Sequence, residues 1–311
     1  MIKLLLLTGF LGSGKTTLMT NILGSYAGEK VGVIVNEFGA AGVDGALLAR
    51  EGVKAGENMI ELNNGSIFCA CIKANFLQSL IDMSKRDISW LFIEPSGIAD
   101  PSEMGAILES IAPQLGQAYD YTGLVCVVDA ETFPKLSKVL PALARQVEYC
   151  GAAVINKADL VDQAQLEQVT RMVSELNAGC EIIVTSHCRL DVRGLAARLA
   201  PAGMAARDST NTPASRPYSI VLKPGEPVPT AALHELILQL QPHAYRIKGF
   251  LPAEDGTVAE ISAVGSVINI QPWSGGDVGH GLVIISAVGI GIISRIAGAL
   301  EEGGLKGKLL L

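Results

Sequence analysis

A glycine-rich loop that runs into a lysine and two threonines is the first part of this sequence that could do chemistry. Residues 8–17 read TGFLGSGKTT and contain the pattern G-x-x-x-x-G-K-T. Glycines without a Cβ let successive backbone N–H groups wrap a phosphate, and a helix beginning near Lys15 adds its positive dipole end. Lys15 can reach the β- and γ-phosphates, and the Thr16 hydroxyl can ligate Mg²⁺. The loop therefore predicts a nucleoside triphosphate site.

The residues around this loop agree with that interpretation. An apolar run at residues 2–7 predicts a buried strand before the loop, and residues 17–26 have helical spacing after it. A strand-to-helix turn without a ligand is the alternative role. The residues predicted to contact the nucleotide here are Gly9, Gly12, Ser13, Gly14, Lys15, Thr16 and Thr17, and Lys15 is also predicted to be catalytic.

A second nucleotide motif, NKAD at residues 156–159, follows an apolar run at residues 152–155. The Asp159 carboxylate can accept two hydrogen bonds from guanine, at its ring N–H and its exocyclic amine, whereas adenine offers no such pair. Asn156 and Lys157 can brace the loop and cover the base, and Thr185 at the next strand end can touch its other side. A solvated helix cap is the alternative role for Asp159. The motif predicts guanine specificity.

Two carboxylates follow other predicted strands. Glu94 ends the run at residues 89–93 and matches the acid that binds Mg²⁺ directly or through water, and Gly97 lets the backbone approach the γ-phosphate. Glu37 follows the run at residues 30–35, where it could polarise the attacking water or bind a second metal. A strand-end surface acid is the alternative for each. Glu94 and Glu37 are predicted catalytic residues, and Glu94 joins Thr16 as a Mg²⁺ ligand.

Cys69 and Cys71 form a C-x-C pair in a predicted loop beside the same edge. Two thiolates can ligate one soft or borderline metal, but a closed tetrahedral site needs two more ligands. Candidates are Glu37, a second copy of the chain, or a client protein; otherwise the cysteines pack as small apolar groups. The other four cysteines, Cys126, Cys150, Cys180 and Cys188, are predicted to be structural. The four histidines are dispersed, so no zinc-protease helix is expected.

Strands and helices alternate through roughly the first 200 residues, and the strands are continuous apolar runs. This pattern predicts an α/β fold, a P-loop NTPase domain with a mostly parallel, doubly wound sheet whose carboxyl edge gathers the polar residues into one site. We expect this domain over residues 1–202, a linker at 203–217, and a smaller α+β domain over 218–311.

Composition excludes several classes of protein. A net charge of −7 without a run of Lys and Arg argues against a nucleic-acid surface. Six widely spaced cysteines, with no disulfide framework, fit a reducing cytosol and predict a cytoplasmic protein. Residues 278–294 hold no Asp, Glu, Lys or Arg, but their four glycines favour a strand at 281–286 and a helix at 290–300 over a membrane span.

Together these motifs resemble the CobW family of GTPases, relatives of the nickel-insertion GTPases of hydrogenase and urease maturation. The resemblance rests on TGFLGSGKTT, NEFG at residues 36–39 with Gly42 and Asp44, NNG at 63–65, EPSGIADP at 94–101, NKAD, and RIKG at 246–249. It implies a Mg²⁺-dependent GTPase that hydrolyses GTP to GDP and phosphate. It also implies delivery of zinc or cobalt to a metalloprotein or corrinoid-protein client. A homodimer is the assembly in which a second copy of the chain would supply metal ligands.

The cysteine loop departs from the family pattern, C-x-C-C directly after N-G. Ser66 and Phe68 stand where the first two cysteines would be, Cys69 aligns with the third, and Cys71 is additional. The three-thiolate site is therefore not intact, and no histidine-rich tail replaces it. This leaves two hypotheses open: a metallochaperone or metal-insertion factor, and a metal-free GTP-driven chaperone of a corrinoid or metalloenzyme. An ATP-dependent kinase is a third alternative, against which NKAD speaks.

Overall fold

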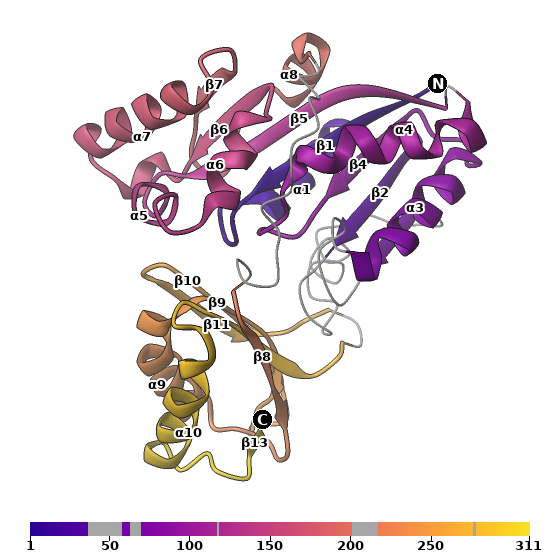
Figure 1. Cartoon of the computed structure of the whole chain (residues 1–311). Coiled ribbons are helices and arrows are strands. Elements are labelled where there is room, and N and C mark those ends of the chain that lie inside the picture. The colour runs from indigo at the N-terminus through magenta and orange to yellow at the C-terminus, as the bar shows by residue number, and fades with distance from the viewer. Residues whose placement is uncertain (37–57, 63–69, 117, 201–216, 276–277) are drawn as a thin grey trace. The chain divides into compact units, whose positions relative to one another are not determined.

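A computed structural model describes residues 1–36, 58–62, 70–116, 118–200, 217–275 and 278–311 (Figure 1). The chain divides into two compact units: the described residues up to 200 belong to the first, and those from 217 onwards belong to the second. Each unit is described by itself.

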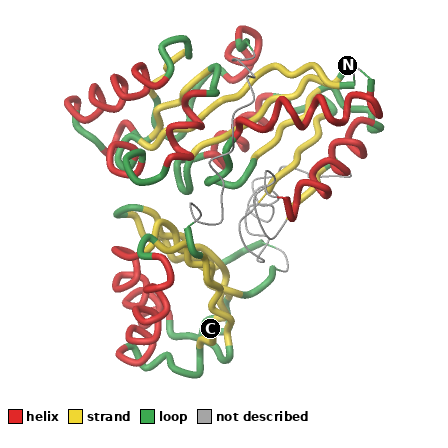
Figure 2. Tube along the Cα trace, in the orientation of Figure 1, coloured by secondary structure: helices red, strands yellow, loops and turns green. Residues whose placement is uncertain are grey.

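The first unit is built on a parallel sheet. Its strands are β1 (Ile2–Gly9), β2 (Val31–Asn36), β3 (Met59–Leu62), β4 (Trp90–Glu94), β5 (Tyr119–Asp129), β6 (Ala152–Asn156) and β7 (Glu181–Val184). They form one seven-stranded sheet in the order β3-β2-β4-β1-β5-β6-β7, and all neighbouring strands are parallel. Figure 2 shows these strands in yellow with helices in red around them. Most of the apolar runs that predicted these strands are buried on both faces, as a covered parallel sheet requires. The predicted α/β class is confirmed.

Helices cover both faces of this sheet. They are α1 (Lys15–Ser25), α3 (Ala70–Ser84), α4 (Met104–Leu115), α5 (Phe133–Leu136), α6 (Pro141–Glu148), α7 (Gln163–Leu176) and α8 (Val192–Arg198), with short 3₁₀ turns η1 (Pro101–Glu103) and η2 (Ala158–Leu160). On one face, α1 and α8 bury Leu18 and Leu195 against alternate strand residues such as Leu5. The intervening strand residues are buried on the other face, where α4 and α6 lie in front of the sheet in Figure 1.

Three helices of this unit, α4, α5 and α6, were not predicted from the sequence. Proline explains part of this, because Pro113 lies inside α4 and prolines stand in the first turns of α5 and α6. Strand β5 begins at Tyr119, and a register shift against β1 interrupts its alternation before Gly123. Tertiary packing therefore stabilises helices for which the local sequence signal is weak.

The second unit is an antiparallel sheet with helices. Its elements are β8 (Ser219–Pro224), α9 (Thr230–Leu240), η3 (Gln241–His243), β9 (Ala244–Pro252), β10 (Val258–Val264), β11 (Val267–Pro272), β12 (Gly281–Ser286), η4 (Gly289–Gly291), α10 (Ile292–Glu302) and β13 (Leu309–Leu310). The six strands lie in the order β11-β10-β9-β12-β8-β13 with antiparallel neighbours. Helices α9 and α10 share one hydrophobic core with the sheet. The predicted α+β class is confirmed.

Two features noted in the sequence of this unit correspond to defined elements of the structure. The uncharged segment forms β12 and α10, close to the expected strand and helix, and none of the helices within the described ranges is long and apolar enough to cross a membrane. The RIKG motif lies on β9, between β10 and β12. A Cβ on Gly249 would lie 1.9 Å from the Gly281 carbonyl oxygen, so this position requires glycine.

Candidate nucleotide site

The phosphate loop lies between β1 and α1, and its backbone explains its glycines. Gly9, Gly12 and Gly14 have φ values of 140°, 75° and 112°, which side chains disfavour. A Cβ on Gly9 would lie 2.3 Å from the Val127 carbonyl oxygen, and one on Gly14 would lie 2.4 Å from Asn156 Nδ2. These two positions accept only glycine because neighbouring strand ends press against the loop.

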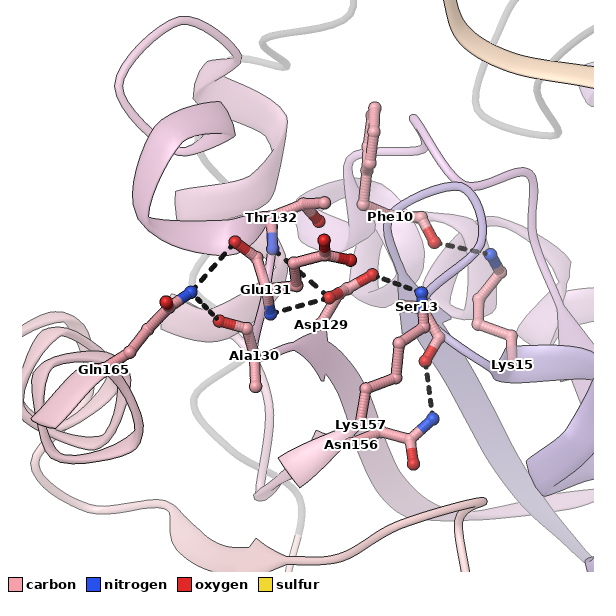
Figure 3. Close-up of polar contacts among 10 residues, drawn as sticks. All are labelled: Phe10, Ser13, Lys15, Asp129, Ala130, Glu131, Thr132, Asn156, Lys157 and Gln165. Carbon is pink, nitrogen blue, oxygen red and sulfur yellow. Dashed lines mark hydrogen bonds and ion pairs between the residues drawn. The ribbon is translucent and has the colours of Figure 1, made fainter. Parts of the chain in front are cut away.

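Polar groups inside the loop suit an anionic ligand. Lys15 is buried, and its Nζ donates to the Phe10 carbonyl oxygen at 3.2 Å, so the ammonium group lies across the loop (Figure 3). Ser13 is also buried, and its hydroxyl has no hydrogen-bond partner among the described residues. A buried hydroxyl without a partner costs free energy, which a bound phosphate oxygen would recover. Thr16 is half-buried and Thr17 is exposed at the start of α1.

Asn156 joins the phosphate loop to the loop that follows β7. Its Nδ2 donates to the Ser13 carbonyl oxygen at 2.8 Å, and its Oδ1 accepts from the Cys188 backbone N–H at 2.9 Å. The Cys188 Sγ also lies 3.4 Å from the Gly14 carbonyl oxygen. One buried amide therefore holds the expected phosphate and guanine segments together, 143 residues apart in sequence.

Lys157 has a left-handed backbone, with φ of 63°, and its side chain turns back to β5. Its Nζ lies 2.6 Å from Asp129 Oδ2, and the Asp129 side chain is only 2% exposed. The other carboxylate oxygen, Oδ1, accepts the backbone N–H groups of Glu131 at 2.9 Å and Thr132 at 3.2 Å (Figure 3). Asp129 therefore holds Lys157 in one conformation.

None of the motifs identified in the sequence includes Asp129. The parallel register pairs Asp129 with Asn156, which puts Lys157 one residue beyond the carboxylate. Gln165 of α7 supports the same turn by donating to the Ala130 and Glu131 carbonyl oxygens at 3.1 and 3.2 Å. The signal that could have revealed this ion pair is a carboxylate at the end of one strand and a lysine directly after the end of the neighbouring strand.

Asp159 lies exposed in the turn after Lys157, where it can meet a ligand. A hydrogen bond from Ser186 lowers the pKa of the Asp159 carboxyl below its ordinary value, with a smaller contribution from its own backbone. The group is therefore a carboxylate at neutral pH and offers only acceptors, which matches the paired donors of guanine. Thr185 is buried, and its hydroxyl donates to the Arg189 carbonyl oxygen at 2.7 Å. This hydrogen bond stabilises the loop after β7.

Glu94 and Gly97 lie at and just after the end of β4, which flanks β1 on the side opposite β5. Glu94 is buried at the end of β4, and a Cβ on Gly97 would lie 2.7 Å from the Leu11 backbone nitrogen. Gln146, which is buried in α6, donates to the carbonyl oxygens of Gly97 at 3.2 Å and Ala99 at 2.9 Å. The expected Mg²⁺ acid and its glycine thus adjoin the loop, and Gln146 is a supporting residue that sequence reasoning missed because α6 was not predicted.

The proposed transition-metal ligands are described only in part. Glu37 and Cys69 lie outside the described residues. Cys71 was expected in a loop, but this prediction is wrong, because its backbone belongs to the first turn of α3, which begins at Ala70. Elsewhere in the described parts of the chain, no group of three or more His, Cys, Asp or Glu side chains could hold a metal ion.

Similarity to known proteins extends over both units. The family model described as "CobW/HypB/UreG, nucleotide-binding domain" matches residues 3–184, and "Cobalamin synthesis protein cobW C-terminal domain" matches residues 218–292. The zinc chaperone YjiA of Escherichia coli is 31% identical over 198 residues, which cover 61% of this chain and 59% of that protein.

The zinc-regulated GTPase metalloprotein activator 1 of Schizosaccharomyces pombe is 30% identical over 191 residues, covering 60% of this chain and 46% of that protein. The alignments thus span about half the length of these relatives. Among solved structures, Zn(II)-bound YjiA GTPase from E. coli is 23% identical with a TM-score of 0.47, covering 96% of this chain and 98% of that one.

Proposed function

The chain belongs to the CobW/HypB/UreG family, and we propose that it is a GTPase, which hydrolyses GTP to GDP and phosphate and uses the cycle to deliver a metal. The observation that carries the proposal is the double hydrogen bond of Asn156, at 2.8 Å to the phosphate loop and 2.9 Å to the loop after β7. It joins the phosphate loop to the loop after β7, whose Ser186 hydrogen-bonds the Asp159 carboxylate that is suited to guanine.

On this proposal, backbone N–H groups of residues 9–14 and the Lys15 ammonium group bind the phosphates, as the glycine backbone and the unpartnered Ser13 hydroxyl suggest. Thr16 and Glu94 would hold Mg²⁺, which supplies charge neutralisation on the β- and γ-phosphates. Gly97 would approach the γ-phosphate. Glu37 would orient the attacking water or hold a second metal. Asn156, Lys157, Asp159 and Thr185 would form the guanine side of the site.

Release of phosphate from GTP and from ATP tests the nucleotide part of the proposal. We expect slow, Mg²⁺-dependent hydrolysis of GTP and little hydrolysis of ATP. The rate of GTP hydrolysis should fall roughly 100-fold in the Lys15→Ala variant, because the ammonium group that binds the phosphates is removed. Lys30→Ala is the matched control, since Lys30 is an exposed partner of Asp87. Unchanged hydrolysis in Lys15→Ala would exclude this site as the source of the activity.

We further propose that the delivered ion is zinc or cobalt, bound by Glu37, Cys69 and Cys71 and passed to a metalloprotein or corrinoid-protein client. The names of the relatives, zinc chaperone and GTPase metalloprotein activator, support the metal-handling part. The domain division at residues 203–217, a cytoplasmic location and a homodimer that completes the metal site belong to the same proposal.

One observation favours a second candidate, a metal-free GTP-driven chaperone. Ser66 and Phe68 replace two cysteines of the family pattern, and Cys71 belongs to a helix. Titration of the fully reduced chain with Zn²⁺ and Co²⁺, with GDP and then with a non-hydrolysable GTP analogue, separates the two. A thiolate-to-metal absorption band that is lost in Cys69→Ser/Cys71→Ser supports metal delivery. No band with either nucleotide supports the chaperone.

A further inference from the structure

We propose that Cys150 and Cys180 form a dithiol site that low-molecular-weight disulfides, such as glutathione disulfide, convert to an intramolecular disulfide. The site is separate from the nucleotide-binding edge and from the C-x-C segment, so the inference does not rest on the proposed function. The sequence alone suggested only structural roles for both residues.

The backbone brings the two cysteines together at the amino ends of adjacent strands. Cys150 follows α6 and Cys180 follows α7, and the parallel register pairs Ala152 with Glu181. The Glu181 N–H donates to the Gly151 carbonyl oxygen at 3.0 Å, directly after both cysteines. At this junction the Cys150 and Cys180 thiols are near enough for each to shift the pKa of the other.

Asn177 fixes this junction from the end of α7. Its Nδ2 donates to the carbonyl oxygens of Val147 at 3.0 Å, Glu148 at 3.2 Å and Cys150 at 2.9 Å. Its own backbone carbonyl oxygen accepts from the Cys180 N–H at 3.4 Å. One residue therefore contacts both cysteine backbones, which limits separation of the thiols and favours a bond between them.

The two thiols differ in access and acidity. Cys180 is partly exposed, and the hydrogen bond from Cys150 lowers the pKa of its thiol to about 7, so a large thiolate fraction exists at neutral pH. Cys150 is buried, with its Sγ 3.1 Å from the Val147 carbonyl oxygen, and donation to Cys180 together with burial raises the pKa of its thiol. Cys180 is therefore the attacking sulfur, and Cys150 is the resolving one.

The reaction balances with glutathione disulfide as oxidant. The Cys180 thiolate attacks one sulfur of glutathione disulfide, forms a mixed disulfide and releases one glutathione thiolate, which takes up the Cys150 proton through solvent. Cys150 then attacks Cys180 Sγ and releases the second glutathione thiolate, which takes up from solvent the proton that Cys180 lost on ionising. Two protein thiols are oxidised to one disulfide, and one glutathione disulfide is reduced to two glutathione molecules.

Cys126 and Cys188 do not combine partial exposure with a lowered thiol pKa. Cys126 is buried in β5, and burial raises the pKa of its thiol. Cys188 is buried beneath the phosphate loop, and burial raises its pKa to about 12. Selective oxidation should therefore occur at the Cys150–Cys180 pair.

The test uses the full chain carrying Cys69→Ser/Cys71→Ser, so that only Cys126, Cys150, Cys180 and Cys188 remain as thiols. The reduced protein is treated with glutathione disulfide, alkylated, digested and mapped by mass spectrometry. We expect a Cys150–Cys180 cross-linked peptide before any other disulfide, and its loss on reduction with dithiothreitol. A cross-link between Cys180 and Cys126, or no cross-link under conditions that modify Cys180, would overturn the proposal.

Single variants test the order of attack. Cys150→Ser should accumulate a stable glutathione adduct on Cys180, whereas Cys180→Ser should lower the rate of glutathione incorporation at Cys150 at least 10-fold. Cys126→Ser is the matched control and should still form the disulfide. Equal reactivity of Cys150 in Cys180→Ser would contradict the assignment. If a serine variant fails to fold, the rates of alkylation of Cys180 and Cys150 in the parent protein decide the order instead.

Discussion

The two ends of strands β6 and β7 carry different chemistry. At their carboxyl ends, Asn156 and the residues from Lys157 to Asp159 adjoin the phosphate loop and the loop after β7, held by an amide bridge and an ion pair. At their amino ends, helices α6 and α7 finish and Cys150 and Cys180 meet. One pair of strands thus supports a charged, hydrogen-bonding site at one edge and a thiol pair at the other.

The difference follows from the direction of the chain in a parallel sheet. Carboxyl ends are followed by turns and helix N-termini, whose N–H groups attract anions, whereas amino ends receive the ends of the preceding helices. Substitutions at the carboxyl ends should therefore change nucleotide binding, while changes at the amino ends should change stability and redox chemistry. The largest effect on nucleotide affinity is expected at Asp159.

Asp159→Asn should weaken GDP binding by about 1,000-fold, because two charge-assisted hydrogen bonds to guanine are lost. The asparagine amide should instead donate to the carbonyl of xanthine, so affinity for xanthosine diphosphate should rise. Titration with fluorescent GDP and XDP measures both. Equal loss for the two nucleotides would mean that Asp159 does not read the base.

Asn156→Ala should weaken GDP binding by about 30-fold and lower the free energy of unfolding by about 2 kcal/mol, because the buried Cys188 N–H loses its acceptor. Fluorescent-GDP titration and urea denaturation measure the two effects. Asn269→Ala, at an exposed position in the second unit, is the control. A stability loss with unchanged GDP affinity would show that the bridge does not position the site.

Asp129→Asn should weaken GDP binding by about 10-fold, because the variant keeps an acceptor for the Glu131 and Thr132 N–H groups but loses the charge that holds Lys157. The GDP dissociation rate in stopped flow should rise correspondingly. Asp87→Asn, which breaks the exposed pair with Lys30, should leave that rate unchanged. Similar rates in both variants would argue against Asp129 as a positioning residue.

Oxidation of the Cys150–Cys180 pair should change GDP affinity by less than about twofold, yet raise the thermal midpoint by roughly 5–10 °C because the unfolded chain is constrained. Differential scanning calorimetry of the oxidised chain, before and after dithiothreitol, checks the shift. Cys150→Ser/Cys180→Ser should show no such shift. A large change in GDP affinity on oxidation would show that the thiol pair and the nucleotide site are coupled, which would contradict this comparison.

Much of the fold was predictable from the sequence because its signals are local. Apolar runs indicated the parallel strands, and the uncharged segment at residues 278–294 was correctly predicted to form a strand and a helix. Helices α4 to α6 were missed where prolines interrupt or begin them, and the first turn of α3 was wrongly predicted to be a loop. Packing against the sheet stabilises these helices beyond what local propensity indicates.

Local sequence specifies the kinds of chemistry available: a glycine-rich phosphate loop, a strand-end acid and the N-K-A-D motif, because residue type and close spacing define each one. The distant residues that support them are set by the folded chain. Strand order and register decide four such arrangements: the Asp129–Lys157 pair, the Asn156 bridge, Gln146 beside the Glu94 segment, and the closeness of Cys150 to Cys180. Register joins residues far apart along the chain, and no local pattern encodes those distances.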